Sequence, residues 1–182
     1  EKGVPVLRDL SFRVSPGETL AIVGYTGGGK TSVLNLLLRL YDADSGSVLV
    51  DGIDVREHDP QALRRRFGMV FQDVLLFSGT VEANIRLGEE LPQASLDRAI
   101  ELACGKNMLS RLPRGFDSDL QARGSALSTG ERQLLSFARA LAKDPPILVL
   151  DEATSSVDAE TEALIQQAMD NALTGRTAVI VA

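Results

Sequence analysis

Residues 20–32 read LAIVGYTGGGKTS, an apolar run that passes into a glycine-rich segment and then into a lysine and two hydroxyls. Gly24, Gly29, Lys30 and Thr31 fit the phosphate-loop spacing G-x-x-x-x-G-K-[ST], with the strand before and the helix after that this pattern requires. Glycines there let the backbone take positive φ and bring its N–H groups close to phosphate oxygens. The stretch therefore predicts a phosphate site at the end of a strand.

The loop as a whole is expected to bind a nucleotide. Its N–H groups and the start of the next helix would supply partial positive charge, Lys30 would reach the β- and γ-phosphates, and Thr31 would bind Mg²⁺. A glycine-rich turn without a ligand would explain the glycines but not the Lys30–Thr31 pair. The expected binding residues are Gly24, Tyr25, Thr26, Gly27, Gly28, Gly29, Lys30 and Thr31.

Composition limits the classes of protein to consider. The chain has 182 residues, 44% of them hydrophobic, which suits one compact core. A formal charge of -6 argues against a nucleic-acid partner, because such partners need a positive field. Cys104 is the single cysteine, which excludes a disulfide framework and is expected to be a packing residue. No apolar run approaches the roughly 18 residues that a membrane span needs.

The apolar pattern predicts a parallel α/β sheet. Continuous apolar runs at 20–23, 147–150 and 178–182 are typical of strands covered on both faces. Helices are expected to follow the first two, at 30–40, leucine-rich almost all round and therefore buried, and at 159–173. Further strands are expected at 47–50 and 67–71, and an all-helical subdomain at approximately 80–143, with helices at 81–86, 95–104 and 129–142.

A carboxylate pair follows the second apolar strand. Asp151 would hold Mg²⁺ directly or through water, as in a Walker-B motif, and Glu152 would act as the general base that polarises a water attacking the γ-phosphate. The alternative is that the pair only begins a solvated loop.

Three more motifs complete a resemblance to the nucleotide-binding domain of an ATP-binding cassette (ABC) transporter, over almost the whole chain. Phe71-Gln72-Asp73 resembles the family's Q-loop, Leu127-Ser128-Thr129-Gly130-Glu131 its LSGGQ signature, and Ser155-Ser156-Val157-Asp158 its D-loop. The resemblance implies that Gln72 contacts Mg²⁺ and the attacking water and couples to a membrane domain. It also implies that Ser32 touches the α-phosphate and that Asp158 crosses to a partner domain.

The same resemblance implies a fold: a RecA-like P-loop NTPase core with a parallel sheet, an N-terminal antiparallel β portion and an inserted helical subdomain. Stretches 71–85 and 115–141 resemble exporters, although Gln121-Ala122 replaces the usual Gly-Glu of the X-loop. We expect residues 1–182 to be a domain cut from a longer polypeptide at both ends. The adenine-stacking aromatic would then precede Glu1 and the switch histidine would follow Ala182.

The signature departs from the family pattern at Thr129 and Glu131. From the residues alone, Ser128 and Glu131 form a capping box at a helix start. A helix start of this kind can also bind an anion, so the signature could receive the γ-phosphate of ATP held by another copy. The charge of Glu131 should weaken ATP-driven closure unless the helix dipole and Arg132 offset it.

The function expected is ATP hydrolysis that drives head-to-tail dimerisation and powers an exporter. The partners would be ATP with Mg²⁺, a second nucleotide-binding domain and a transmembrane domain of the same polypeptide, at the cytoplasmic face of the membrane. Three different functions are also compatible with parts of the sequence: a soluble ABC ATPase, a GTPase or small-molecule kinase, and an ATP-binding regulatory half of a heterodimer. The N-K-x-D motif of a GTPase is absent, and Glu152 argues against the regulatory half.

Two further features are expected to have no role in the site. His58 lies in a polar turn and is expected to be solvated, and Arg64-Arg65-Arg66 is expected to form a solvated helix face or a contact with the membrane domain.

Overall fold

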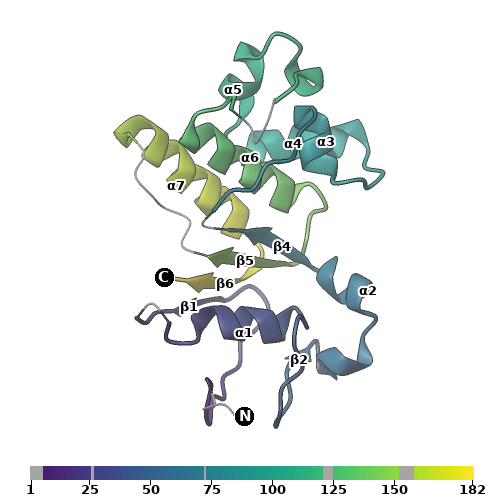
Figure 1. The fold of residues 1–182 in the computed structure, drawn as a ribbon, viewed down its shortest axis with the longest axis vertical. Coiled ribbons are helices and arrows are strands. Elements are labelled where there is room, and N and C mark those ends of the chain that lie inside the picture. Colours follow the sequence, from purple (N-terminus) through teal and green to yellow (C-terminus); the bar gives the residue numbers. More distant parts are fainter. Residues whose placement is uncertain (1–5, 26, 72, 121–124, 152–157) are drawn as a thin grey trace.

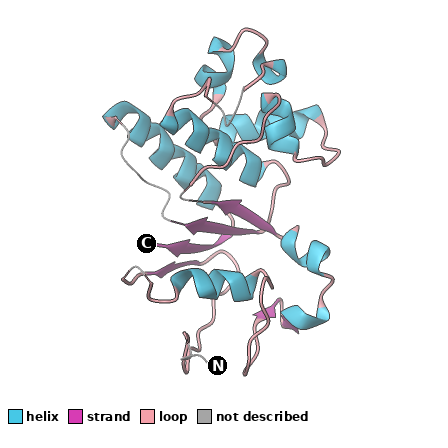
Figure 2. Cartoon of the chain, in the orientation of Figure 1, coloured by secondary structure: helices cyan, strands magenta, loops and turns pink. Residues whose placement is uncertain are grey.

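A parallel sheet lies between two groups of helices (Figures 1 and 2). The computed structural model describes residues 6–25, 27–71, 73–120, 125–151 and 158–182. Within this part of the chain the sheet has the order β1-β6-β5-β4, and every neighbouring pair is parallel. The strands are β1 (Thr19–Ile22), β4 (Phe67–Val70), β5 (Ile147–Asp151) and β6 (Thr177–Val181). The expected α/β fold class is confirmed.

The two central strands are buried on both faces. In β5, Leu148 and Leu150 belong to the core shared with the larger helical group, whereas Val149 belongs to the core shared with α1. Ala178 and Val179 of β6 divide between the same two cores. Alternate side chains of a strand point to opposite faces, so an unbroken apolar run is what a strand between two helical layers needs.

Strand β1 differs from its prediction. Thr19 and Ala21 are exposed, Leu20 and Ile22 are half-buried, and Val23 is 75% exposed. The cause is position, because among the described residues β1 is an edge strand that pairs only with β6. The expectation of two covered faces holds for β5 and β6 but is wrong for β1.

The smaller layer contains α1 (Lys30–Leu37), the 3-10 turn η1 (Val55–Glu57), α2 (Pro60–Arg64) and the antiparallel pair β2 (Leu49–Val50) and β3 (Ile53–Asp54). The antiparallel pair confirms the expected antiparallel β portion. The prediction that α1 is buried all round is wrong, because only Leu34 of the helix and Leu38 just after it are buried. Arg39 then takes a φ of 49°, which ends the helical course before Leu40.

The larger helical layer covers the other face. It contains α3 (Val81–Arg86), α4 (Gln93–Leu102), α5 (Lys106–Arg111), the 3-10 turn η2 (Gly115–Asp117), α6 (Thr129–Leu141) and α7 (Ala159–Leu173). Between residues 80 and 143, the described part holds helices and one isolated bridge between Thr80 and Asp119. None of the helices among the described residues combines the length and apolar character needed to cross a bilayer.

Arg64 and Arg65 are exposed, as expected of a solvated helix face, whereas the expectation for His58 is corrected. Arg64 donates from Nε to the carbonyl of Leu38, at 3.2 Å, and from Nη2 to that of Arg39, at 3.0 Å, so it satisfies the end of α1. His58 is half-buried, and its Nε2 is buried without a hydrogen-bond partner in the described part of the chain. His58 therefore helps to pack the smaller layer.

Candidate functional site

The carboxyl ends of β1, β6 and β5 meet at one edge of the sheet (Figure 1, where the C-terminus marks it). Ile22 and Asp151 are both in register with Val181, so the three residues form one row across the strands. Two strand spacings put the backbones of Ile22 and Asp151 about 10 Å apart. The glycine-rich loop, which begins two residues after Ile22, therefore starts at the edge of the sheet where Asp151 ends β5.

The loop has the backbone that the sequence predicts. Gly27 and Gly29 take φ values of 81° and 85°, and the N–H of Gly28 donates to the carbonyl of Tyr25 at 2.9 Å. A Cβ on Gly28 would lie 2.9 Å from that carbonyl oxygen, so the turn closes only around glycine. Gly29 precedes α1 and has no side chain to cap it, which leaves the first N–H groups of the helix for an anion.

Lys30 places a full positive charge on this loop. Its ammonium donates to the carbonyl of Gly24 and lies 3.5 Å from that of Tyr25. Thr31 and Ser32 occupy the first turn of α1 directly behind it. The cradle, the ammonium and the hydroxyls together fit the phosphates and the metal ion of a nucleotide.

Two of the expected acidic and amide groups lie outside the described residues. Asp151, half-buried, ends β5, and Glu152 follows it outside the described part of the chain. Val70, the last residue of β4, is in register with Leu150, so β4 ends at the same edge of the sheet as β5. Gln72 and Thr26 also lie outside the described residues, as do the X-loop residues 121–124 and residues 155–157 of the D-loop.

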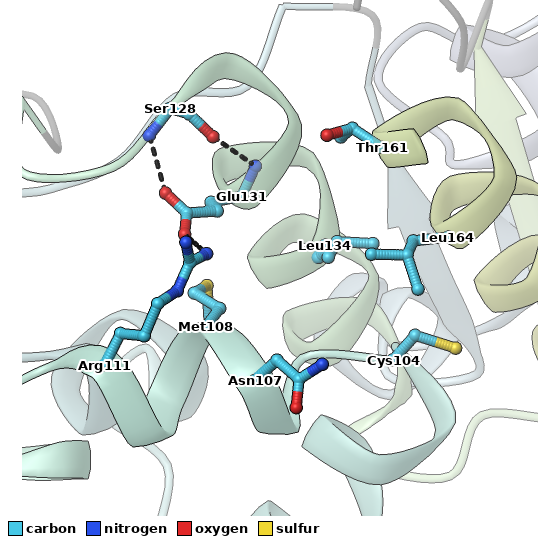
Figure 3. A pocket seen from close by; sticks show the side chains of 9 residues that line it. All are labelled: Cys104, Asn107, Met108, Arg111, Ser128, Glu131, Leu134, Thr161 and Leu164. Carbon is cyan, nitrogen blue, oxygen red and sulfur yellow. Dashed lines mark hydrogen bonds and ion pairs between the residues drawn. The ribbon is translucent and has the colours of Figure 1, made fainter. Parts of the chain in front are cut away.

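The signature begins α6 and forms the predicted capping box (Figure 3). Ser128 Oγ accepts from the Glu131 N–H at 3.3 Å, and the Ser128 N–H donates to Glu131 Oε2 at 2.8 Å. Arg132, named above as a residue that could offset the charge of Glu131, contacts different groups. It donates from Nη1 to the Leu127 carbonyl, at 3.0 Å, and from Nη2 to the Thr129 hydroxyl, at 3.1 Å.

The signature and the start of α7 are packed together. Asp158 caps α7 by accepting from the Thr161 N–H at 3.0 Å and from its hydroxyl at 2.8 Å. These hydrogen bonds from Thr161 lower the pKa of the Asp158 carboxyl. A Cβ on the buried Gly130 would lie only 1.9 Å from Thr161 Cγ2. Within one chain, Asp158 therefore acts on the signature through Thr161.

The phosphate loop and the signature of one chain emerge on opposite sides of the sheet. Leu34 of α1 packs in one core, whereas Leu134 and Phe137 of α6 pack in the other. Figure 1 shows α1 and α6 on opposite sides of the strands. The structure therefore brings the loop together with Asp151, and the signature together with Asp158.

Three residues at these sites were missed by the sequence analysis. Arg111 at the end of α5 forms an ion pair with Glu131. Arg139 donates to the Leu75 and Asn84 carbonyls and to Asn84 Oδ1, at 2.8–3.0 Å, and burial lowers the pKa of its guanidinium. Thr161 packs on Gly130. Each acts on residues at least 20 positions away, and no local sequence pattern signals such a contact.

Comparison with known proteins settles the family. The profile of the ABC transporter family matches residues 7–155. The chain belongs to the ABC transporter family. The match spans the phosphate loop, Asp151 and the signature, and confirms the resemblance expected from the five motifs.

Individual relatives of this ABC domain are named as ABC transporter ATP-binding/permease proteins, and a solved relative is named as an ABC exporter. It is 48% identical over its full length to the probable multidrug resistance ABC transporter ATP-binding/permease protein YheH of Bacillus subtilis, of which it covers 27%. It is 46% identical, over 99% of its length, to a fatty acid ABC transporter ATP-binding/permease protein of Mycobacterium bovis, of which it covers 29%. The solved structure of a bacterial Atm1-family ABC exporter with ATP bound matches all of the chain with a TM-score of 0.89 and 39% identity.

The ABC domain spans about a third of the proteins that it matches, 32% for the solved exporter. The family assignment makes it an ATP-binding, ATP-hydrolysing domain of the ABC type. It does not favour the soluble ABC ATPase, the GTPase, the small-molecule kinase or the regulatory half of a heterodimer.

Proposed function

We propose that this ABC domain binds MgATP at the β1 and β5 edge of the sheet and hydrolyses it to power an exporter. The observation that supports the proposal best is the row formed by Ile22, Val181 and Asp151, which sets the phosphate loop beside a carboxylate. Nucleotide sites of open parallel sheets lie at this edge, beyond the carboxyl ends of the strands.

Each group of the site would have a separate role. The glycine N–H groups and Lys30 would hold the phosphates, and Ser32 would contact the α-phosphate. Thr31, Asp151 and Gln72 would hold Mg²⁺. When bound, Mg²⁺ would neutralise charge on the β- and γ-phosphates. Glu152, next to Asp151, would accept a proton from the attacking water.

The placement of the signature supports a site shared between two copies. Within one chain the signature lies across the sheet from α1, so it is badly placed for the ATP on its own loop. In a head-to-tail dimer, residues Leu127–Glu131 of one copy would face the γ-phosphate held by the other. Asp158 would cross at the same interface.

An exposed apolar segment supports docking to a transmembrane partner. Phe71, Leu75 and Phe77 are 50%, 64% and 51% exposed, and Arg139 fixes the segment by its bond to the Leu75 carbonyl. The guanidinium carbon of Arg139 also lies over the Phe77 ring, 5.7 Å from its centre. Exposed apolar side chains gathered in one short segment are typical of a protein interface. The domain would then work at the cytoplasmic face of a membrane, on a transmembrane domain of the same polypeptide.

The Glu152→Gln variant tests the catalytic assignment. In the purified, natural-length polypeptide it should lower ATP turnover by about a hundredfold or more, the range of general-base catalysis, while ATP binding is kept. Glu160→Gln, the same change in the first turn of α7, is the matched control and should keep turnover. Turnover of Glu152→Gln equal to that of the parent would overturn the assignment.

Complementation tests the shared site. Lys30→Ala removes the loop's cation and Ser128→Arg blocks the signature, so each variant alone should be inactive. In a mixed dimer, one phosphate loop and one signature remain intact and face each other. If pairing is random, half of the dimers in an equal mixture are mixed and each has one intact site, so the mixture should recover roughly a quarter of parental turnover. A mixture with no more activity than the two separate variants would refute pairing between copies.

A further inference from the structure

The signature of this chain carries an ion pair that the motif itself does not contain. Arg111, in the last turn of α5, donates from Nη2 to Glu131 Oε1, while the second carboxylate oxygen accepts the Ser128 N–H at 2.8 Å (Figure 3). Both oxygens of Glu131 are therefore engaged. The Glu131 side chain is only 19% exposed, whereas that of Arg111 is 71% exposed.

The charge of Glu131 poses a physical problem for the proposed function. A carboxylate at the start of α6 is stabilised by the helix dipole when no ligand is present. A triphosphate that approached the same helix start would meet a like charge there, and like charges at close range weaken binding. A signature with Glu131 therefore needs a positive charge held against that carboxylate.

Among the described residues, Arg111 and Arg132 lie at the signature, and of these two Arg111 meets this need. Arg132 is occupied by the Leu127 carbonyl and the Thr129 hydroxyl. Arg111 contacts the carboxylate itself, and it does so beside the apolar side chain of Met108 (Figure 3). Nearby apolar groups reduce the screening of such a pair by water.

We infer that Arg111 is a positioning residue of the signature: it neutralises Glu131 so that the start of α6 accepts the phosphates of ATP bound to a second copy. The inference rests on the proposed function and adds a residue from outside every motif to the shared site. Arg111 acts through Glu131 and not on the nucleotide, so its removal is harmful only while Glu131 is charged.

Charge restoration tests the inference in the natural-length polypeptide. Arg111→Gln leaves Glu131 uncompensated and should raise the KM for ATP about fivefold with little change in kcat, the size expected for one partly exposed charge interaction. The double variant Arg111→Gln, Glu131→Gln removes both charges and should return KM to within about twofold of the parent. Arg111→Lys keeps the positive charge and should behave like the parent. The defect of Arg111→Gln should also shrink as salt is raised.

The controls separate the possible causes. Arg98→Gln removes the same charge from the exposed face of α4 and should leave KM unchanged. A merely structural tie between α5 and α6 would be missing from the double variant too, so a double variant as impaired as Arg111→Gln would overturn the inference. An unchanged KM in Arg111→Gln would also overturn it.

The same measurements distinguish this inference from the proposed function. A parent that turns over ATP, together with an Arg111→Gln variant that matches it, would refute only the role of Arg111. A parent that neither binds nor hydrolyses ATP would refute both.

Discussion

Gly130 of the signature lies against Thr161 so closely that no side chain fits between them. A Cβ on Gly130 would lie 1.9 Å from Thr161 Cγ2 and 3.2 Å from Thr161 Cβ. Thr161 cannot turn away freely, because its hydroxyl and its N–H both donate to Asp158. We therefore predict that Gly130→Ala destabilises the domain, although alanine is the better helix former.

The size of the effect follows from two opposing terms. Alanine gains about 1 kcal/mol over glycine in a helix interior, and at most that much at Gly130, which is the second residue of α6. Overpacking of a well-filled site costs about 1–3 kcal/mol, so the net loss should be about 1 kcal/mol. Thr161→Ser removes Cγ2 and keeps the hydroxyl. In that background Gly130→Ala should become neutral or stabilising, so the coupling energy between the two positions should be about 2 kcal/mol.

Equilibrium urea unfolding followed by far-UV circular dichroism measures the free energies of unfolding of the parent, both single variants and the double variant. Gly105→Ala serves as the matched control, because a Cβ there meets Ile100 Cδ1 at an ordinary 3.4 Å, and its effect should not depend on Thr161. If Gly130→Ala costs the same free energy of unfolding with and without the Thr161→Ser change, the packing argument is refuted.

Three more changes have defined outcomes. Lys30→Met should lower the affinity for a fluorescent ATP analogue by about tenfold or more, since a charge-assisted contact to phosphate is lost. Lys143→Met removes an ammonium paired with Glu89 and should leave that affinity unchanged. Equal losses of affinity in the two variants would contradict the role assigned to Lys30. The pKa of Asp158 is lowered in the folded state, so its stabilisation of α7 is complete above the unfolded carboxyl pKa of about 3.9 and is lost as the pH falls from there through the folded value. The NMR shift of the Thr161 amide should therefore titrate with a midpoint below about 3.9. A midpoint at or above that value would exclude the cap. Arg139→Lys should lower the free energy of unfolding by about 2 kcal/mol, because an ammonium cannot reach all three acceptors that the planar guanidinium reaches. Arg98→Lys on the exposed face of α4 should have almost no effect. Similar losses from both variants would count against the Arg139 network.

The fold follows from the sequence where local pattern and tertiary position agree. The strand at 147–150 and the helices at 81–86 and 159–173 lie where they were predicted, the strand extended by one residue to Asp151. The short helices α2 and α5 were not predicted: α5 starts without a side-chain cap, and the start signal of α2, Asp59 at the N-cap with Pro60 after it, was not used. The exposure of β1 was not predicted either, since an apolar run does not tell whether its strand lies at the edge or the centre of a sheet.

The candidate site likewise combines parts that a local sequence pattern predicts with a contact that depends on tertiary packing. The phosphate loop, Asp151 and the capping box are local patterns, and the sequence alone located them. The partner of Glu131 could not be found in this way: the sequence offers Arg132, the next residue, as a possible neighbour, but Arg111 on another helix makes the contact. Which of two nearby arginines reaches a carboxylate is decided by how α5 packs on α6.

The edge strand β1 has a consequence for how the protein is made. Its partner in the sheet, β6, comes far later in the chain: the Gly17 N–H, just before β1, donates to the Thr177 hydroxyl 160 residues away. A ribosome adds that many residues in roughly 10–30 s. During that time the segment of β1 lacks β6, its partner among the described residues, and closing so long a loop is slow even after synthesis. The phosphate loop therefore gains its support last, so a nascent chain cannot present a finished nucleotide site before β6 has left the ribosome.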